Sequence, residues 1–146
     1  MKPAAWMCIV GLGATLGLGC DDPSPSEVEE PESTATFMLT FDGTWSQATH
    51  PMSFPSNPHF SGLIGATHRS GYVMWDVGQL ASTGIKDMAE LGSKSTLTAE
   101  INVAIQAGLA GPVVSGNGIG LAPGTTSVEF EVSSRFPLLS ITSMIA

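Results

Sequence analysis

Cysteine is absent from most of the chain, because both cysteines, Cys8 and Cys20, lie within the first 20 of its 146 residues. A body without thiols can form no disulfide, no zinc–thiolate site and no cysteine nucleophile. Bases are also scarce after residue 34, where the chain holds only four at wide spacing: Arg69, Lys86, Lys94 and Arg135. Nucleic-acid binding needs clustered Lys and Arg to neutralise phosphates, so no nucleic-acid partner is expected.

The chain also lacks an apolar run long enough to cross a membrane as a helix. Its longest run, Ala4 to Leu18, has about 15 residues broken by glycines and Thr15, whereas a spanning helix needs about 20. Lys2 precedes the run, and a short apolar segment behind a positive charge is typical of a secretory signal peptide. A buried N-terminal helix is the alternative, but each glycine would weaken it by about 1 kcal/mol.

The apolar run ends in Leu16-Gly17-Leu18-Gly19-Cys20. This segment resembles the bacterial lipobox, in which small residues precede a cysteine that is lipidated and becomes the new N-terminus. The sequence departs from the usual pattern at Gly17, the position three places before the cysteine, where leucine is usual. We predict that residues 1–20 are a lipoprotein signal peptide and that lipid on Cys20 anchors the chain to the membrane. The alternative is ordinary secretion.

Residues 21–34 (DDPSPSEVEEPEST) hold six of the chain's 13 acidic residues, three prolines and a single large hydrophobe, Val28. Such a segment cannot bury enough apolar surface to offset the entropy lost on ordering it. We therefore predict an acidic disordered linker, with a cation-binding tail as the alternative. Most of the net charge of −8 comes from this segment, so the remaining 112 residues (35–146), enough for one domain, are only mildly acidic.

Residues 35–146 show strand patterns toward both ends. Residues 36–41 and 127–132 alternate apolar and polar side chains as half-buried strands do. Residues 136–145 are more apolar, which suits a strand buried on both faces. Residues 71–75 (GYVMW) are expected to form a further short strand.

Helical patterns occur between these strands. One helix is expected over residues 82–91, with Ser82 or Thr83 as its N-cap and Gly92 at its end. A second is expected over 95–107, ended by Gly108, and residues 111–124 are expected to be a loop. The order of elements predicts a mostly β fold, an antiparallel β-sandwich with one or two inserted helices.

Several short sequence segments, taken together and in order, resemble the spondin domain of the F-spondin and mindin family. They are Phe41-Asp-Gly-Thr-Trp-Ser46, His50-Pro51, Phe54-Pro55, His59-Phe-Ser-Gly-Leu-Ile-Gly-Ala-Thr-His68, Tyr72-Val-Met-Trp75, Ala81-Ser-Thr-Gly-Ile-Lys-Asp-Met-Ala-Glu90, Val128-Glu-Phe-Glu-Val132 and Phe136-Pro-Leu-Leu-Ser-Ile-Thr-Ser-Met-Ile-Ala146. The resemblance covers nearly all of residues 35–146. It implies an antiparallel β-sandwich that acts in extracellular adhesion and has no enzymatic activity.

In the family, the strand that resembles residues 136–146 continues into a Pro-Ser-Pro-Asp-Trp segment, whereas this sequence stops at Ala146. We therefore expect residues 35–146 to be a spondin-type domain that is incomplete at its C-terminus. The resemblance, together with the signal and Cys20, implies a cell-envelope lipoprotein that binds a protein or glycan at the cell surface. Secretion without an anchor is the alternative location.

The resemblance also implies a calcium ion at one end of the sandwich, with Glu131 in the position of a family ligand. Calcium takes about 6–8 oxygen ligands, usually from several carboxylates. The family's partner aspartates belong to the segment after Ala146, so Glu131 is a tentative calcium ligand in a site that this sequence does not complete. A solvent-facing strand acid is the alternative for Glu131.

Other clusters have simpler explanations. His50, His59 and His68 recur every nine residues, but this spacing matches no metal motif, so hydrogen-bonding loop histidines are expected. Gly116–Gly120 lacks the flanking elements of a phosphate loop and is expected to be a turn. Core or loop-anchor roles are expected for the aromatic residues Trp45, Phe54, Tyr72 and Trp75, with a binding face as the alternative.

No catalytic residue is predicted, because no nucleophile elbow is present. Two other functions stay open as alternatives. One is a secreted or envelope hydrolase, which would need converging polar groups in a deep pocket. The other is a truncated structural envelope protein without a specific ligand.

Overall fold

The computed structural model describes residues 31–146. The predictions for the signal peptide, for Cys20 and for linker residues 21–30 lie outside the described residues. Within the described part the elements are β1 (Thr34–Gly43), β2 (Ile64–His68), α1 (Thr83–Leu91), α2 (Ser95–Gln106), β3 (Ala110–Ser115), β4 (Gly124–Ser133) and β5 (Leu138–Thr142).

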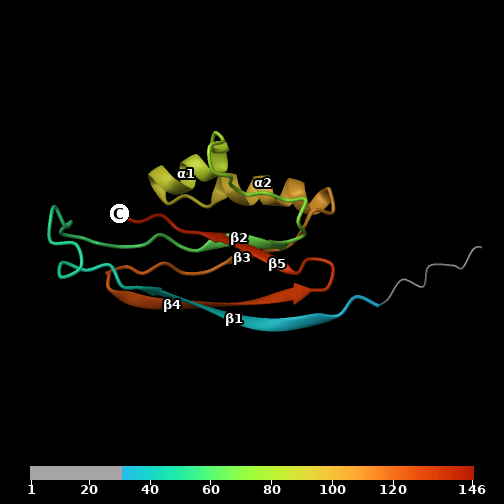
Figure 1. The fold of residues 1–146 in the computed structure, drawn as a ribbon, viewed down its shortest axis with the longest axis horizontal. Coiled ribbons are helices and arrows are strands. Elements are labelled where there is room, and N and C mark those ends of the chain that lie inside the picture. Colours follow the sequence, from blue (N-terminus) through green and yellow to red (C-terminus); the bar gives the residue numbers. More distant parts are fainter. Residues whose placement is uncertain (1–30) are drawn as a thin grey trace, which may run out of the picture. The chain divides into compact units, whose positions relative to one another are not determined.

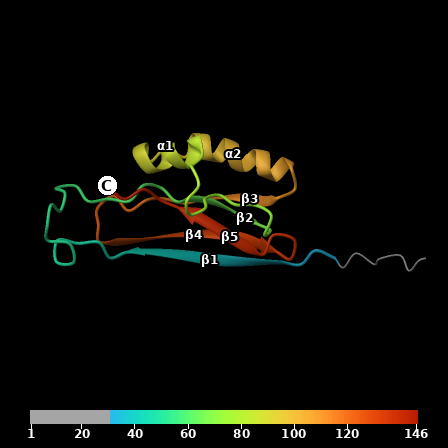
Figure 2. The same cartoon turned by 45° about the horizontal axis from the view of Figure 1, so that its top comes forward.

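The five strands form two antiparallel sheets that lie in separate layers (Figures 1 and 2). Strands β1 and β4 pair in one sheet, and the other has the order β3-β2-β5. Helices α1 and α2 cover the face of the three-stranded sheet that points away from β1 and β4 (Figure 1). This arrangement confirms the expected mostly β fold of two antiparallel sheets with two inserted helices.

The β1–β4 sheet follows from the alternation that predicted its strands. Phe37 lies opposite Phe130, with ring centroids 6.1 Å apart, and Leu39 lies opposite Val128. Side chains on the other face, including Glu131 opposite Thr36, are exposed. Phe37 is 51% exposed, so the apolar face of this sheet is only partly covered by the described residues.

The main core lies between the helices and the three-stranded sheet. It consists of Ile64, Ala66, Met88, Leu97, Ile101, Ala104 and Ala110. These residues come from both helices and from strands β2 and β3. Apolar burial here is the main stabilising term for the domain, because each fully buried large aliphatic side chain contributes about 1.5–3 kcal/mol.

Both predicted helices form, each with its ends within one residue of those predicted. The Ile85 N–H donates to the Ser82 Oγ at 3.2 Å, as an N-cap requires, and Gly92 ends α1 with a positive φ of 64°. Gly108, with φ of 67°, follows α2.

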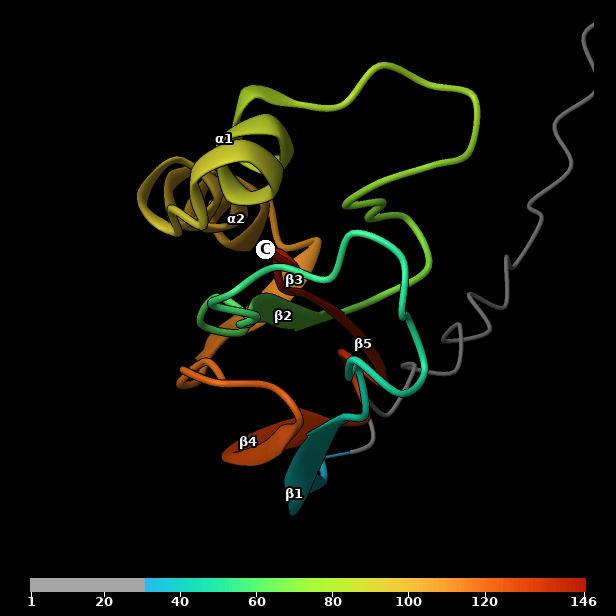
Figure 3. The same ribbon diagram turned by 90° about the vertical axis from the view of Figure 1, so that its left-hand side faces the viewer.

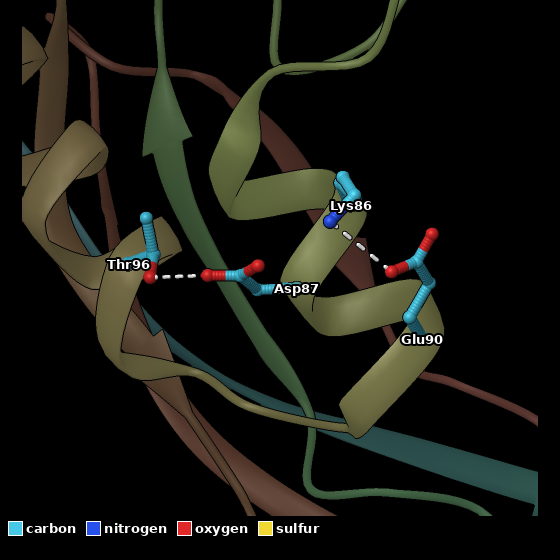
Figure 4. Close-up of polar contacts among 4 residues, drawn as sticks. All are labelled: Lys86, Asp87, Glu90 and Thr96. Atoms are coloured by element: carbon cyan, nitrogen blue, oxygen red, sulfur yellow. Dashed lines mark hydrogen bonds and ion pairs between the residues drawn. The ribbon is translucent and has the colours of Figure 1, made fainter.

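The two helices are joined by a hydrogen bond in which the Thr96 hydroxyl donates to Asp87 at 2.6 Å (Figure 4). Asp87 therefore links α1 to α2. On the outer surface of α1, Lys86 and Glu90 form an exposed ion pair at 3.2 Å.

Three element predictions were wrong. Residues 71–75 form turns and irregular backbone, and the strand lies earlier, at Ile64–His68. Its Gly65 has no room for a side chain, because a Cβ there would collide with the Ser140 carbonyl of β5. Gly65 and Ala66 thus interrupt the run of β-branched residues by which strands are usually predicted.

The predicted loop at 111–124 begins instead with strand β3. Pro112 obscured this strand in the sequence, but β3 is an edge strand, where proline is tolerated. The last strand is also shorter than predicted and lies at the opposite edge, and Leu138 is 44% exposed. The expectation that this strand is buried on both faces was therefore wrong.

Candidate binding sites

Glu131 lies on the exposed face of β4, and Glu129 projects from the same face two residues before it. Within residues 31–146, no three His, Cys, Asp or Glu side chains come together as a metal site would require. Calcium needs about 6–8 oxygen ligands. The described residues therefore supply Glu131 but not the rest of a calcium site, and the calcium assignment stays a prediction.

The three histidines do not meet in the structure. His50 Nδ1 contacts the Thr49 hydroxyl at 3.0 Å, and His59 Nδ1 donates to the Asn57 carbonyl at 2.9 Å. Both lie in the long β1–β2 connection, where hydrogen-bonding loop histidines were expected. The third, His68, belongs to β2 and is only 7% exposed, so it is not a loop residue.

His68 forms the one Ser–His contact in the described residues. Its Nδ1 lies 2.9 Å from the Arg69 carbonyl, which can only accept, so Nδ1 carries the proton. Its Nε2 lies 2.9 Å from the Ser140 hydroxyl, and in the neutral ring with the proton on Nδ1 it accepts that hydrogen bond. The Tyr72 ring packs edge to face against the imidazole, with the two ring centroids 5.3 Å apart. A carbonyl rather than a carboxylate orients the ring, and sequence reasoning missed this pair because its members are 72 residues apart.

Ser140 also borders a cavity of about 600 Å³ at the edge of β5. The cavity is lined by Met74, Trp75, Ile85 and residues 139–142. Trp75 belongs to the segment between β2 and α1, which Figure 3 shows as a long loop extending away from the sheet before it returns to α1. Tyr72 packs against the core, as expected, and so does Met74. Trp75 is 59% exposed, so the core role expected for it was wrong.

A second polar cluster joins the two helices. Glu100 of α2 accepts from the Ser82 hydroxyl at 2.6 Å and from the Gly84 N–H at 2.8 Å, at the start of α1. Partial burial, and secondarily the negative charge of Glu100, raise the pKa of Tyr72 above its usual value. The cluster orders helix ends, and none of its residues lines the cavity beside β5.

A second cavity, which we call the aromatic pocket, lies at the end of β1. It has a volume of about 560 Å³ and is lined by Phe41, Asp42, Gly43, Thr44, Trp45, His50, Phe60 and Ile145. Trp45 packs edge to face on Phe54 and on Phe60, with ring centroids 5.0 Å and 6.3 Å apart. These contacts confirm the expected loop-anchor role of Trp45 and Phe54, and the same rings border an open hollow that the sequence did not reveal.

Together, the described residues form a β-sandwich domain with shallow, partly aromatic pockets and no assembled catalytic or metal centre. None of the helices in residues 31–146 has both the length and the apolar character of a membrane span. The class defined by this fold and these sites is a β-sandwich module whose chemistry is suited to binding.

Comparison with known proteins gives the family. The model of the spondin N-terminal domain family (Spondin_N) matches residues 35–146. Spondin-1 of Gallus gallus is 37% identical over an alignment of 120 positions that covers 77% of this chain. Spondin-2 of Homo sapiens is 35% identical over an alignment of 133 positions that covers 88% of this chain. The chain therefore belongs to the spondin N-terminal family.

The aligned region spans 15% of Spondin-1 of Gallus gallus and 40% of Spondin-2 of Homo sapiens. The family relationship thus concerns one domain of longer relatives. It accounts for the sandwich and for the sequence segments that predicted it. The activity and partners of this chain remain to be proposed.

Proposed function

We propose that this protein is an exported, lipid-anchored, non-enzymatic binding module that attaches the bacterial cell envelope to a protein or glycan at a cell surface. The observation that carries the proposal is the spondin N-terminal domain at residues 35–146 behind a signal-like N-terminus that ends at Cys20. Residues 1–20 act as the signal peptide and the acidic residues 21–34 as the spacer. The outer membrane or a periplasm-facing leaflet is the expected location.

The anchor can be tested with the chain's two cysteines as a matched pair. The full chain is produced in a bacterial host that is fed a labelled fatty acid, alongside Cys20→Ala and Cys8→Ala variants. We expect the wild type and Cys8→Ala to carry the label and to remain with the membrane fraction, because several acyl chains anchor a protein firmly. Cys20→Ala should lose the label. Unlabelled wild-type protein recovered from the medium would instead support ordinary secretion.

We also propose that calcium strengthens the domain through Glu131, with the remaining ligands supplied from outside the described residues. Calcium at about 100 times its dissociation constant would stabilise the fold by about 2.7 kcal/mol. In a chain that carries the family's Pro-Ser-Pro-Asp-Trp segment after Ala146, the melting temperature with wild-type Glu131 and with Glu129→Gln should therefore rise with calcium, while that with Glu131→Gln should not. An equal response in all three proteins, or no response in the wild type, would remove Glu131 from the proposal.

The contact between Ser140 and His68, beside a cavity, is the observation that favours the rival hydrolase. Two features count against it. His68 is oriented by a backbone carbonyl instead of a carboxylate, and its ring is almost fully buried in the sheet. A serine hydrolase needs a base that can reach both its nucleophile and the substrate. We therefore assign the pair a structural role that ties β2 to β5.

A further inference from the structure

The connection between β3 and β4 is held at two points, one on each side of Asn117. Before it, the Gly116 N–H donates to a carbonyl of the β1–β2 connection at 3.0 Å. After it, Ile119 and Phe60 exchange two backbone hydrogen bonds, at 2.9 and 3.0 Å. Only Asn117 and Gly118 lie between these fixed points, so the main chain there has little freedom to change its length.

Gly118 is required by the packing around it. A Cβ at this position would collide with the Phe60 carbonyl oxygen and would lie 2.7 Å from the Ser61 carbonyl carbon. Asn117, by contrast, is exposed, and no hydrogen bond within residues 31–146 involves its side-chain amide or the Gly118 N–H. The fold therefore places glycine directly after an asparagine whose amide has no structural role in the described residues.

We propose that Asn117 is a site of spontaneous deamidation. The Gly118 backbone nitrogen attacks the side-chain carbonyl carbon of Asn117, and the new N–C bond closes a succinimide ring. The side-chain nitrogen takes up the Gly118 proton and leaves as ammonia. Water then opens the ring at either of its carbonyls, which gives aspartate or isoaspartate. The reaction needs only the chain and water, so it is independent of the proposed binding function.

The chain has two other asparagines, and neither is placed to react in this way. Asn57 precedes Pro58, whose nitrogen carries no hydrogen and is closed into a ring. Asn102 lies inside α2 and precedes Val103, whose nitrogen is held in the helix and crowded by a β-branched side chain. Both are exposed, as Asn117 is, so they serve as internal controls for access to solvent.

Isoaspartate would lengthen the main chain where the β3–β4 connection packs against β1 and β4. Its chain runs through the side-chain carbons, which adds one carbon. Ile119 is 5% exposed and fills the space beside Gly43 of β1 and Gly124 of β4, where a Cβ would lie 2.9 and 2.8 Å from its side chain. Because the segment is held on both sides, the extra carbon weakens the hydrogen bonds between Ile119 and Phe60. Aspartate adds only a negative charge.

The reaction is followed by incubating the folded full chain in mildly alkaline buffer, because the attacking nitrogen must lose its proton, and by mass spectrometry of its digest. Incubation lasts until a synthetic peptide of residues 114–120 is fully converted. We expect most molecules to lose the amide of Asn117, and no detectable loss at Asn57 or Asn102. The product carries one more negative charge than the formal −8 of the chain, so ion exchange separates it. Retention of the amide at Asn117 in the folded chain would overturn the assignment.

Two variants separate the effect of the longer main chain from that of the charge. Incubated Asn117→Gln should keep its mass and melting temperature, because glutamine closes the corresponding larger ring far more slowly. Fresh Asn117→Asp carries the charge without the extra carbon and should melt like fresh wild type. The isoaspartate fraction of incubated wild type should melt about 4 °C lower, the shift expected for one backbone hydrogen bond in a domain of this size.

Two results would overturn the effect on stability. An isoaspartate fraction that melts like Asn117→Asp would show that the hydrogen bonds between Ile119 and Phe60 tolerate the extra carbon. An equal decrease in the melting temperature of incubated Asn117→Gln would show that the loss arises at another residue.

Discussion

Glu100 shows how one side chain can organise two helices. It projects from the middle of α2 and accepts hydrogen bonds from Ser82 and Gly84 at the start of α1. Gly84 is buried so closely against α2 that a Cβ there would lie 2.7 Å from the Leu97 Cα. The N-cap at Ser82 was predictable from local sequence, whereas its partner Glu100, 18 residues away, was not.

The raised pKa of Tyr72 gives a measurable consequence at the residue scale. Partial burial and the Glu100 charge both favour the neutral phenol in the folded state. The associated stability is therefore present below pH 10, the usual tyrosine value, and is lost as the pH rises through the higher folded-state pKa. Tyr72→Phe should abolish that share of the alkaline loss of stability, which urea unfolding at increasing pH measures.

The same group can be observed directly, because Tyr72 is the single tyrosine of the sequence. The ultraviolet absorbance of tyrosinate should appear at a higher pH than in the unfolded chain. Glu100→Gln should move the transition part of the way back, because it removes only the smaller of the two causes. A folded-state titration that matches the unfolded chain would contradict this account of the cluster.

At the scale of elements, β2 depends on a close approach between backbones. It is the central strand of the three-stranded sheet, and its residues from Ile64 to His68 are all buried. The Cβ that Gly65 lacks would collide with the carbonyl of Ser140 on β5. This strand was missed in the sequence because the pairing that stabilises it is with segments more than 40 residues away.

Gly65→Ala should therefore separate β2 from β5 and destabilise the fold by about 3 kcal/mol, at the upper end of the usual cost of overpacking. Gly120→Ala is the matched control, because a Cβ at Gly120 meets nothing within 4 Å. That control should change the free energy of unfolding by less than about 0.5 kcal/mol. Equal unfolding free energies in urea for the two variants would refute the proposed backbone contact.

The elements that sequence reasoning located correctly are those with local signals. Strands β1 and β4 alternate cleanly, α1 carries Ser82 and Gly92 at its ends, and Gly108 follows α2. Strand β3 starts with glycine and proline, and only its position at a sheet edge makes that sequence compatible with a strand. Spatial relations between distant segments, including the aromatic pocket, needed the structure.

At the scale of the whole molecule, residues 31–146 provide one well-packed layer and one partly covered layer. The helices seal one face of the β3-β2-β5 sheet, whereas Phe37 and Met38 of β1 remain largely exposed. These two neighbours point to opposite faces of the sheet and so do not form one apolar patch. Family membership is what favours a binding role over catalysis.

The most direct test of the central claim is an equilibrium binding measurement on an array of cell-surface proteins and glycans. The full chain and its Ser140→Ala variant are titrated over the same array. We predict saturable binding of both to at least one surface molecule with equal affinity, because Ser140 serves the sheet and does no chemistry. No saturable binding to any molecule, together with covalent labelling of Ser140 by a fluorophosphonate, would contradict the account and favour the hydrolase.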